Sequence, residues 1–289
     1  MRKILVLGKL PPPYFGPAVA TKTILDSSLK YRYQLLHVDT RINSTIATMG
    51  AFKSSKIRNL FRVYSNFYKI LKKEKPDLML LPNAQTTTGF IKDSIFVILA
   101  AFFPIKILLQ LRGSNWLNWF NNCSYITRVY IKKITALCSG VIVLGEKLRY
   151  LFKDFFQDDQ IFVVPNGGNY TFKIDKKGNK DIHILFFANL IESKGIIDFV
   201  DSFNDLRNLN ETIIGLMVGT WHNSEIKEII EETINTKNFP IKTSPAASGE
   251  IKNKFFEEAH IFVFPPRAPE GHPWVIIEAM AAGLPIITT

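Results

Sequence analysis

Short apolar runs alternate with longer stretches of helical spacing along this chain of 289 residues. In the first part of the chain, the runs that predict strands are Lys3 to Leu7, Gln34 to Val38, Asp77 to Leu81, Ile105 to Leu109, Gly140 to Leu144 and Ile161 to Val164. In the second part they are His183 to Ala188, Ile213 to Gly219, Phe239 to Ser244, Ile261 to Phe264 and Ile286 to Thr288. Continuous apolar runs are typical of buried parallel strands, and their alternation with helices predicts a doubly wound α/β fold.

The segment from Lys53 to Lys75 has the clearest helical pattern. Its apolar side chains recur at intervals of three and four, at Ile57, Leu60, Phe61, Tyr64, Phe67, Tyr68 and Leu71. The opposite side carries eight Lys or Arg and one Glu. Two interpretations stay open: the helix lies on an anionic bilayer, or its apolar stripe packs on the sheet while the cations are solvated.

The length of the chain and one polar segment predict two domains. A chain of 289 residues is long for a single core, and Lys173 to Asp181 is polar with one glycine, as a linker would be. We therefore predict an amino-terminal domain over 1–168, a linker over 169–181 and a carboxy-terminal domain over 182–289.

Charge is distributed unevenly between these parts. Residues 1–168 contain 24 Lys and Arg against 9 Asp and Glu, a net of +15, and residues 169–289 contain 12 against 16, a net of −4, which together give the overall +11. The basic first half favours an anionic partner, and a membrane surface, a lipid-linked phosphate and a nucleic acid are the candidates.

Other features restrict the function classes. The apolar run after Arg2 and Lys3 is too short for an export signal, and the stretch from Ile95 to Leu111 is interrupted by Pro104 and Lys106, which favours a helix end followed by a strand over a membrane span. The two cysteines lack metal or redox spacing, so a reduced cytoplasmic protein is expected.

Motifs for several cofactors are absent from the sequence. No two of the five histidines have metal-ligand spacing, no D-x-D occurs, and neither a G-x-G-x-x-G nor a P-loop pattern is present. We therefore expect no metal and no cofactor, and the lack of a reader motif argues against nucleic acid as the partner.

The last thirty residues carry the densest chemistry. A buried strand ends at Pro265, a loop follows, a helix is predicted from Pro273 to Ala282 with Gly283 at its end, and Pro285 leads into the final strand. Glu270 lies in the loop and Glu278 lies about one and a half turns into the helix. In an open α/β sheet, this edge is where ligands bind.

This stretch reads EG-x-P-x4-EAMA-x-G-x-P-x-x-T and resembles the signature of GT4-type retaining glycosyltransferases of the GT-B fold, the glycosyl transferases group 1. The resemblance continues in Val163 to Gly168, in Ala188 to Gly195, and in the glycine-bearing loop after the first strand. It implies two Rossmann-like domains facing across a cleft. Members of the family usually continue well past the position of Thr289, so the resemblance also implies an incomplete second domain.

The resemblance implies roles for residues of the second domain. Glu270 would orient the donor sugar, Glu278 would hold the ribose, and Lys194 would grip the diphosphate. Gly271, His272, Pro273 and Trp274 form the helix start expected against the donor. Asn189 stands where Arg is common in the family, so it would supply a hydrogen bond in place of a cation. Lys252, by contrast, is expected to be solvated.

In the first domain the resemblance points to two loops. Gly16 lies in the loop that would border the cleft, and Asn115 follows the fourth strand. Arg112 occupies the place of a family histidine with an active-site role. A guanidinium there would bind a phosphate or an acidic sugar, or alternatively would form a structural ion pair.

The function implied is metal-independent, retaining transfer of a hexosyl-type sugar from a UDP- or GDP-sugar to a lipid-linked or polysaccharide acceptor. With the basic first half, this suggests a cytoplasmic protein bound peripherally to an anionic membrane surface. Two alternatives remain: an inactive GT-B remnant that binds nucleotide sugar or a partner, and a sugar-nucleotide epimerase of similar fold.

Overall fold

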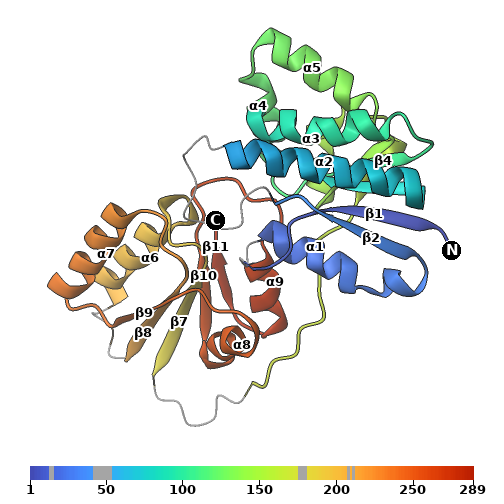
Figure 1. Ribbon diagram of the computed structural model, residues 1–289. Coiled ribbons are helices and arrows are strands. Elements are labelled where there is room, and N and C mark those ends of the chain that lie inside the picture. Colours follow the sequence, from blue (N-terminus) through green and yellow to red (C-terminus); the bar gives the residue numbers. More distant parts are fainter. Residues whose placement is uncertain (13–15, 42–53, 175–180, 207–208, 210–211) are drawn as a thin grey trace. The chain divides into compact units, whose positions relative to one another are not determined.

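The computed structural model describes residues 1–12, 16–41, 54–174, 181–206, 209 and 212–289. The chain divides into two compact units, Met1–Asn166 and Gly167–Thr289. The division lies two residues before the boundary predicted at 168 (Figure 1). Each unit is built around its own parallel sheet, as the alternating pattern predicted.

The first unit contains a six-stranded parallel sheet in the order β2-β1-β3-β4-β5-β6. The strands are β1 (Lys3–Gly8), β2 (Gln34–Asp39), β3 (Leu78–Pro82), β4 (Lys106–Gln110), β5 (Gly140–Val143) and β6 (Ile161–Val163). From β1 the chain adds β2 on one side and then returns to add β3 on the other. This reversal of strand order lies between β1 and β3.

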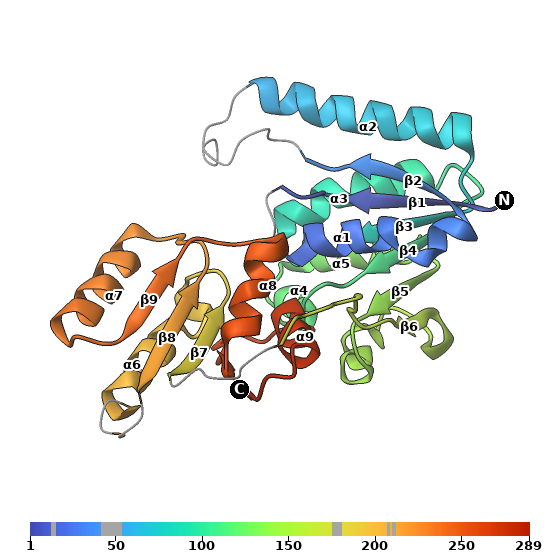
Figure 2. The same ribbon diagram turned by 90° about the horizontal axis from the view of Figure 1, so that it is seen from below.

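Helices cover both faces of this sheet (Figures 1 and 2). They are α1 (Gly16–Asp26), α2 (Ser54–Glu74), α3 (Thr87–Ala100), α4 (Trp116–Asn121) and α5 (Tyr125–Thr135), with 3-10 turns η1 (Ser28–Tyr31), η3 (Glu146–Phe152) and η4 (Asp158–Gln160). Side chains of β1 alternate between the two faces, as a pleated strand requires. Leu5 and Leu7 pack with α2, α3 and α5, whereas Ile4 and Val6 pack with α1.

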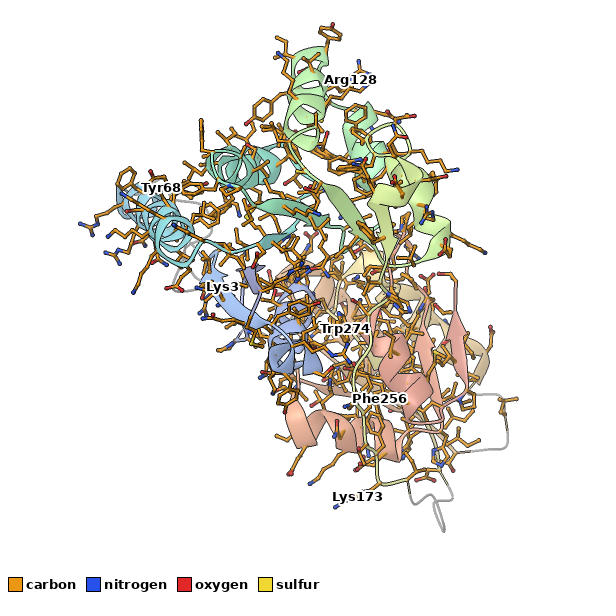
Figure 3. All side chains as sticks on the ribbon, turned by 90° about the vertical axis from the view of Figure 1, so that its right-hand side faces the viewer. Lys3, Tyr68, Arg128, Lys173, Phe256 and Trp274 are labelled. Atoms are coloured by element: carbon orange, nitrogen blue, oxygen red, sulfur yellow. The ribbon has the colours of Figure 1, made fainter. Side chains whose placement is uncertain are left out.

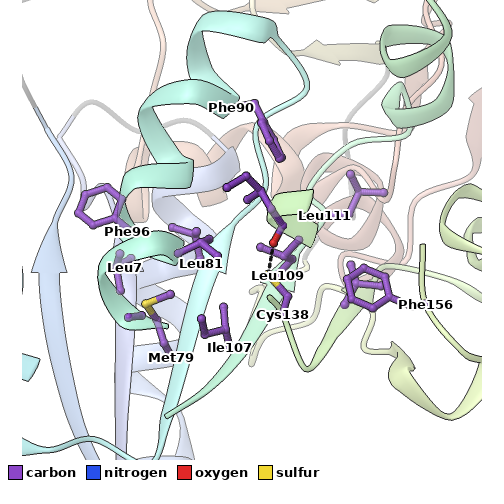
Figure 4. Packing of buried hydrophobic residues seen from close by; sticks show 14 of the residues in the cluster. Leu7, Met79, Leu81, Phe90, Phe96, Ile107, Leu109, Leu111, Cys138 and Phe156 are labelled. Atoms are coloured by element: carbon purple, nitrogen blue, oxygen red, sulfur yellow. Dashed lines mark hydrogen bonds between the residues drawn. The ribbon is translucent and has the colours of Figure 1, made fainter. Parts of the chain in front are cut away.

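The larger of the two cores in this unit is rich in aromatic residues. Phe67 of α2 and Phe96 of α3 meet edge to face at 5.0 Å, and Trp116 stacks on Phe152 at 4.9 Å. Figure 4 shows part of this packing around β3 and β4, together with the Cys138 thiol, which donates to the carbonyl of Ile134. Aromatic pairs of this kind stabilise a core beyond the area that they bury.

The second unit contains a five-stranded parallel sheet in the order β11-β10-β7-β8-β9. The strands are β7 (Ile182–Phe187), β8 (Ile213–Val218), β9 (Ile241–Ser244), β10 (Ile261–Phe264) and β11 (Ile286–Thr288). The helices are α6 (Ile196–Leu206), α7 (Ser224–Thr236), α8 (Gly249–Glu258) and α9 (Trp274–Ala281), with the 3-10 turn η5 (Glu192–Lys194).

The ends of α9 follow from local sequence. Pro273 is its N-cap, where a missing N–H costs nothing, and Gly283 follows its end with a φ of +65° that side chains rarely adopt. Ala279 of this helix and Ala282, its C-cap, are buried against Phe262 and Phe264 of β10. The helix predicted from Pro273 to Ala282 is thereby confirmed.

Every predicted strand is present with ends within two residues of those expected. The helix predicted within Lys53 to Lys75 is also present, as α2 over Ser54–Glu74. The α/β fold is confirmed. One local expectation is wrong: Gly16 was placed in the loop after the first strand, and it is the first residue of α1. Part of the predicted linker, 175–180, lies outside the described residues, as does Lys53. No helix in the described part of the chain is long and apolar enough to cross a bilayer.

Candidate active site

The strand order of the second sheet singles out one position on its edge. From β7 the chain adds β8 and β9 on one side and then returns to place β10 on the other side of β7. Ligands of open α/β sheets bind beyond the carboxyl ends of the strands at such a reversal. Two loops leave the sheet there, 188–195 after β7 and 265–273 after β10, and they contain most of the candidate donor residues.

These two loops are joined through their backbones. The N–H groups of Arg267 and Ala268 donate to the carbonyl of Ser193, at 3.1 and 3.4 Å. Gly195 has a φ of +79°, and a Cβ at this position would lie 1.9 Å from the carbonyl oxygen of Pro265. Only glycine allows the loops to approach this closely.

The contact between the loops brings Lys194 and Glu270 together. The Lys194 ammonium donates to Glu270 Oε1, and each side chain is 26% exposed. The ammonium also lies 5.8 Å from the centre of the Phe264 ring. A cation and a carboxylate separated by 76 positions in the sequence therefore share one partly exposed position at the edge of the sheet.

Glu278 lies deeper, on α9, and is only 4% exposed. Its Oε1 accepts a hydrogen bond from the Lys252 ammonium of α8 at 2.6 Å. The expectation that Lys252 is solvated is therefore wrong: its side chain is 23% exposed and forms an ion pair with the buried carboxylate. Isolated buried carboxylates are costly, so a partner is physically required here.

The electrostatics of this pair are dominated by burial. Burial raises the pKa of the Glu278 carboxyl above its ordinary value, while the charge and hydrogen bond of Lys252 act in the opposite direction. Tyr170 lies within the field of the same carboxylate: burial first, and then Glu278, raise the pKa of its phenol to about 12. Both effects identify Glu278 as a buried carboxyl in an unusual environment, which is a mark of functional sites.

Four of the remaining candidates of this unit lie at the start of α9. Gly271, His272, Pro273 and Trp274 are all partly exposed, and the helix start has no side-chain cap hydrogen bond. Trp274 is labelled on α9 in Figure 3. Asn189 is exposed, two residues after the end of β7. The free N–H groups of a helix start are suited to an anion.

In the first unit, hydrogen bonds to neighbouring residues fix the Arg112 guanidinium. Its Nε and Nη2 donate to Gln110 Oε1 at 3.2 and 2.9 Å, and its Nη1 donates to Thr21 Oγ1 at 3.0 Å and to the carbonyl of Pro17. These bonds use four of the five N–H groups of the guanidinium. Burial lowers the pKa of Arg112 to about 10. The geometry favours a structural role for Arg112 over ligand binding. The side chain fulfils this role through hydrogen bonds and not through the ion pair that was expected.

Gly16 and Asn115 are both exposed at the starts of helices, Gly16 as the first residue of α1 and Asn115 as the N-cap of α4. The Asn115 side chain accepts a hydrogen bond from Asn118 at 2.9 Å. Neither carries a charge or a perturbed titratable group.

Three unpaired polar atoms follow β3 and β4 on the carboxyl edge of the first sheet. Asn83 Nδ2, Gln85 Oε1 and Ser114 Oγ are buried without a hydrogen-bond partner in the described part of the chain. Asn83 is 8% exposed and lies directly beyond β3, at the reversal of strand order between β1 and β3. Buried polar atoms rarely stay unpaired in proteins, so this edge is a second place suited to a polar ligand.

No three His, Cys, Asp or Glu side chains are grouped as a metal site requires anywhere in the described ranges.

Residues 169–289, which include both loops and α9, match the family model of glycosyl transferases group 1. The match covers nearly the whole of the second unit, Gly167–Thr289. No curated protein matches the chain.

Solved structures extend the comparison to the whole chain. Sucrose-phosphate synthase from Thermosynechococcus elongatus is 13% identical, with a TM-score of 0.74 over 100% of this chain and 81% of that one. Anabaena HepE in complex with UDP and glucose is 14% identical, with a TM-score of 0.66 over 100% and 80%. A lipopolysaccharide outer core galactosyltransferase, WaaB, is 12% identical, with a TM-score of 0.60 over 99% and 80%. At these identities the likeness establishes the fold, which is GT-B.

Sequence reasoning missed three parts of this site. Lys252 was dismissed, Tyr170 was not considered, and the ion pair of Arg267 with Asp198, whose two hydrogen bonds measure 2.8 and 2.9 Å, was not foreseen. The one available signal was the buried position of Glu278 on an apolar helix, because a carboxylate in such a place requires a partner.

Proposed function

We propose that the chain is a metal-independent, retaining glycosyltransferase that moves a hexosyl-type sugar from a UDP- or GDP-sugar to a lipid-linked or polysaccharide acceptor. The observation that carries the proposal is the meeting of Lys194, Glu270 and the start of α9 at the strand reversal, in a unit that matches the family model of glycosyl transferases group 1. The complex of HepE with UDP and glucose supports a nucleotide sugar as the donor.

In this proposal, each donor residue has a role that its chemistry allows. The departing nucleoside diphosphate is an anion, so transfer requires stabilised negative charge more than a strong acid. Lys194, the Gly271 amide and the N-terminus of α9 would supply that stabilisation, with His272, Pro273 and Trp274 shaping the helix start. Glu270 would accept hydrogen bonds from hydroxyls of the donor sugar, and Asn189 would donate one hydrogen bond to the diphosphate.

Glu278 would hold the ribose. A carboxylate accepts hydrogen bonds from two neighbouring hydroxyls at once, and the ion pair with Lys252 favours the ionised form of this buried group and fixes its position for that task. Lys252 would then be a positioning residue, since it touches Glu278.

The first unit would receive the acceptor near its own strand reversal. The unpaired atoms of Asn83, Gln85 and Ser114 are suited to hydroxyl groups. The catalytic assignment of Arg112 stays a prediction, as do the cleft roles of Gly16 and Asn115. A lipid-linked acceptor is supported by the likeness to a lipopolysaccharide galactosyltransferase and would place the protein at a membrane surface, on the cytoplasmic side.

The test is release of UDP or GDP from a panel of nucleotide sugars, with the released sugar followed by proton NMR. We expect hydrolysis of one donor with retained anomeric configuration, and at least about a tenfold loss in Lys194→Gln, because a hydrogen bond to a charged group contributes about 1.5–3 kcal/mol. The control is Lys254→Gln on the surface of α8. An inverted product would refute the retaining mechanism, and donor binding without turnover would favour the inactive remnant.

A further inference from the structure

Three helices cover one face of the sheet in the first unit, and their outer sides carry an unusual set of side chains. α3 lies between α2 and α5, and the inner sides of all three are buried in the larger core through Phe67, Phe96 and Ile131. Figure 3 labels Tyr68 on α2 and Arg128 on α5. We call the exposed sides of α2, α3 and α5, with the turn after α3, the outer helical face.

Large apolar side chains are exposed on each part of the outer helical face. They are Phe61 at 75%, Tyr68 at 46%, Ile91 at 49%, Phe102 at 81%, Tyr125 at 74% and Ile126 at 80% exposed. Tyr68 also meets Phe103 edge to face at 5.7 Å, which links α2 to the turn after α3. Single exposed apolar residues are ordinary on soluble proteins, but a shared face of this kind marks an interaction surface.

The same face is strongly basic. The sequences of α2, α3 and α5 contain ten Lys or Arg (six, one and three) against two carboxylates, Glu74 and Asp93. Each carboxylate is paired with a lysine: Glu74 with Lys3 at 3.0 Å and Asp93 with Lys92 at 2.9 Å. The exposed cations therefore include Arg58, Arg62, Lys69, Lys72, Lys132 and Lys133 without a compensating carboxylate on these helices.

The burial of individual residues on α2 bears on the two interpretations that the sequence left open, packing on the sheet and contact with an anionic bilayer. Phe67 and Leu71 are fully buried in the core, whereas Phe61 and Tyr68 of the same apolar stripe are exposed. Different residues of this one apolar stripe therefore pack in the core and lie exposed on the surface. Phe61 and Tyr68 are seven positions apart, so they lie on one side of the helix with exposed cations beside them.

We propose that the outer helical face docks on a bilayer that contains anionic phospholipids. Lysines and arginines would meet the phosphate groups while aromatic and aliphatic side chains enter the headgroup region, as on interfacial helices. The exposed isoleucines favour a lipid over a nucleic acid, because they have neither a ring to stack on a base nor a polar atom. The proposal deepens the proposed function, since it assigns the surface that would bring the protein to a lipid-linked acceptor.

The first test is flotation with vesicles of phosphatidylcholine alone or mixed with phosphatidylglycerol, without any nucleotide sugar, so that it is independent of turnover. We expect binding only to the mixed vesicles and its loss at high salt. Arg62→Gln and Lys69→Gln should each weaken binding about fivefold, which corresponds to about 1 kcal/mol per cation. The matched controls, Lys30→Gln and Arg32→Gln made separately, each remove one charge at or beside η1, next to α1 on the opposite face of the sheet.

The second test asks which side chains enter the lipid. Phe102→Trp on the outer helical face and Tyr31→Trp in η1 replace aromatic residues of similar exposure, 81% and 78%. Brominated lipid should quench the added fluorescence of the first variant and not of the second. Equal quenching of both, equal loss of binding in the charge controls, or binding of an oligonucleotide without binding of mixed vesicles would overturn the proposal.

Discussion

Removal of the Lys252 ammonium is the sharpest perturbation of the second unit. Lys252→Met keeps most of the side chain and leaves the Glu278 carboxylate, whose side chain is 5% exposed, without its cation. Breaking a fully buried pair costs about 3–5 kcal/mol, and a hydrogen bond to a charged group contributes about 1.5–3 kcal/mol. Because the Lys252 side chain remains 23% exposed, water screens part of the interaction, and we expect a loss of about 2 kcal/mol in the free energy of unfolding.

The pH dependence of that loss distinguishes an unpaired charge from lost packing. Burial raises the pKa of folded Glu278 above its unfolded value, so the stability that this group contributes is fully present below the unfolded pKa and is lost as the pH rises through the folded pKa. Lys252 opposes the rise, so its removal raises the folded pKa further. The loss in Lys252→Met should therefore be smaller at acid pH, toward the ordinary pKa of a carboxyl, than at neutral to mildly alkaline pH.

The assay is hydrogen exchange in increasing urea, read on peptides of α8 and α9 so that it reports the second unit. Addition of Glu278→Gln to Lys252→Met should restore stability at the higher pH, because it removes the unpaired charge. Lys254→Met, an exposed lysine on the same helix, should change little. A loss of equal size at both pH values, or no rescue by the second substitution, would show that lost packing and not an unpaired Glu278 charge causes the destabilisation.

Three further predictions test other parts of the structure. Gly195→Ala should lower stability by more than about 1 kcal/mol, because a Cβ would meet Pro265 at a φ of +79°, whereas Gly145→Ala, which meets nothing within 4 Å, should be close to neutral in thermal unfolding. Burial raises the pKa of the Cys138 thiol to about 12, so iodoacetamide near neutral pH should label it only after unfolding, and mass spectrometry that finds native labelling would contradict its burial. Arg112→Lys should lower the free energy of unfolding of the first unit by about 2 kcal/mol, because the two hydrogen bonds of the planar guanidinium to Gln110 are lost. Nucleotide affinity should not change. Unchanged stability with lost turnover would instead support the catalytic assignment.

The strands could be predicted because parallel sheets require continuous apolar runs, and the chain interrupts these runs with proline, glycine and polar loops. Gly16 was placed in a loop because Gly16 and Pro17 resemble loop residues, although proline is well suited to the first turn of a helix. The sequence could not predict which apolar residues of α2 are buried and which are exposed. It shows which side of the helix is apolar, but not how much of that side the core covers.

The residues of the candidate site could be predicted only where they belong to a short local sequence pattern. Glu270 and Glu278 stand in one short pattern at a strand end, and Lys194 stands in another. The pairing of Lys252 with Glu278 joins positions 26 apart through tertiary packing, which no spacing reveals. The hydrogen bonds of Arg112 could not be predicted for a similar reason, because its partners Pro17 and Thr21 come from a distant segment of the chain.

The most direct test of the proposed donor site is calorimetric titration with UDP and GDP of the unaltered chain, Lys194→Gln, Glu278→Gln and the control Lys254→Gln. We expect saturable one-site binding of one nucleotide, weakened at least about tenfold in the first two variants and unchanged in the control. Binding of equal strength in all four proteins, or no binding of either nucleotide, would contradict the assignment of the second unit as the nucleotide-sugar site.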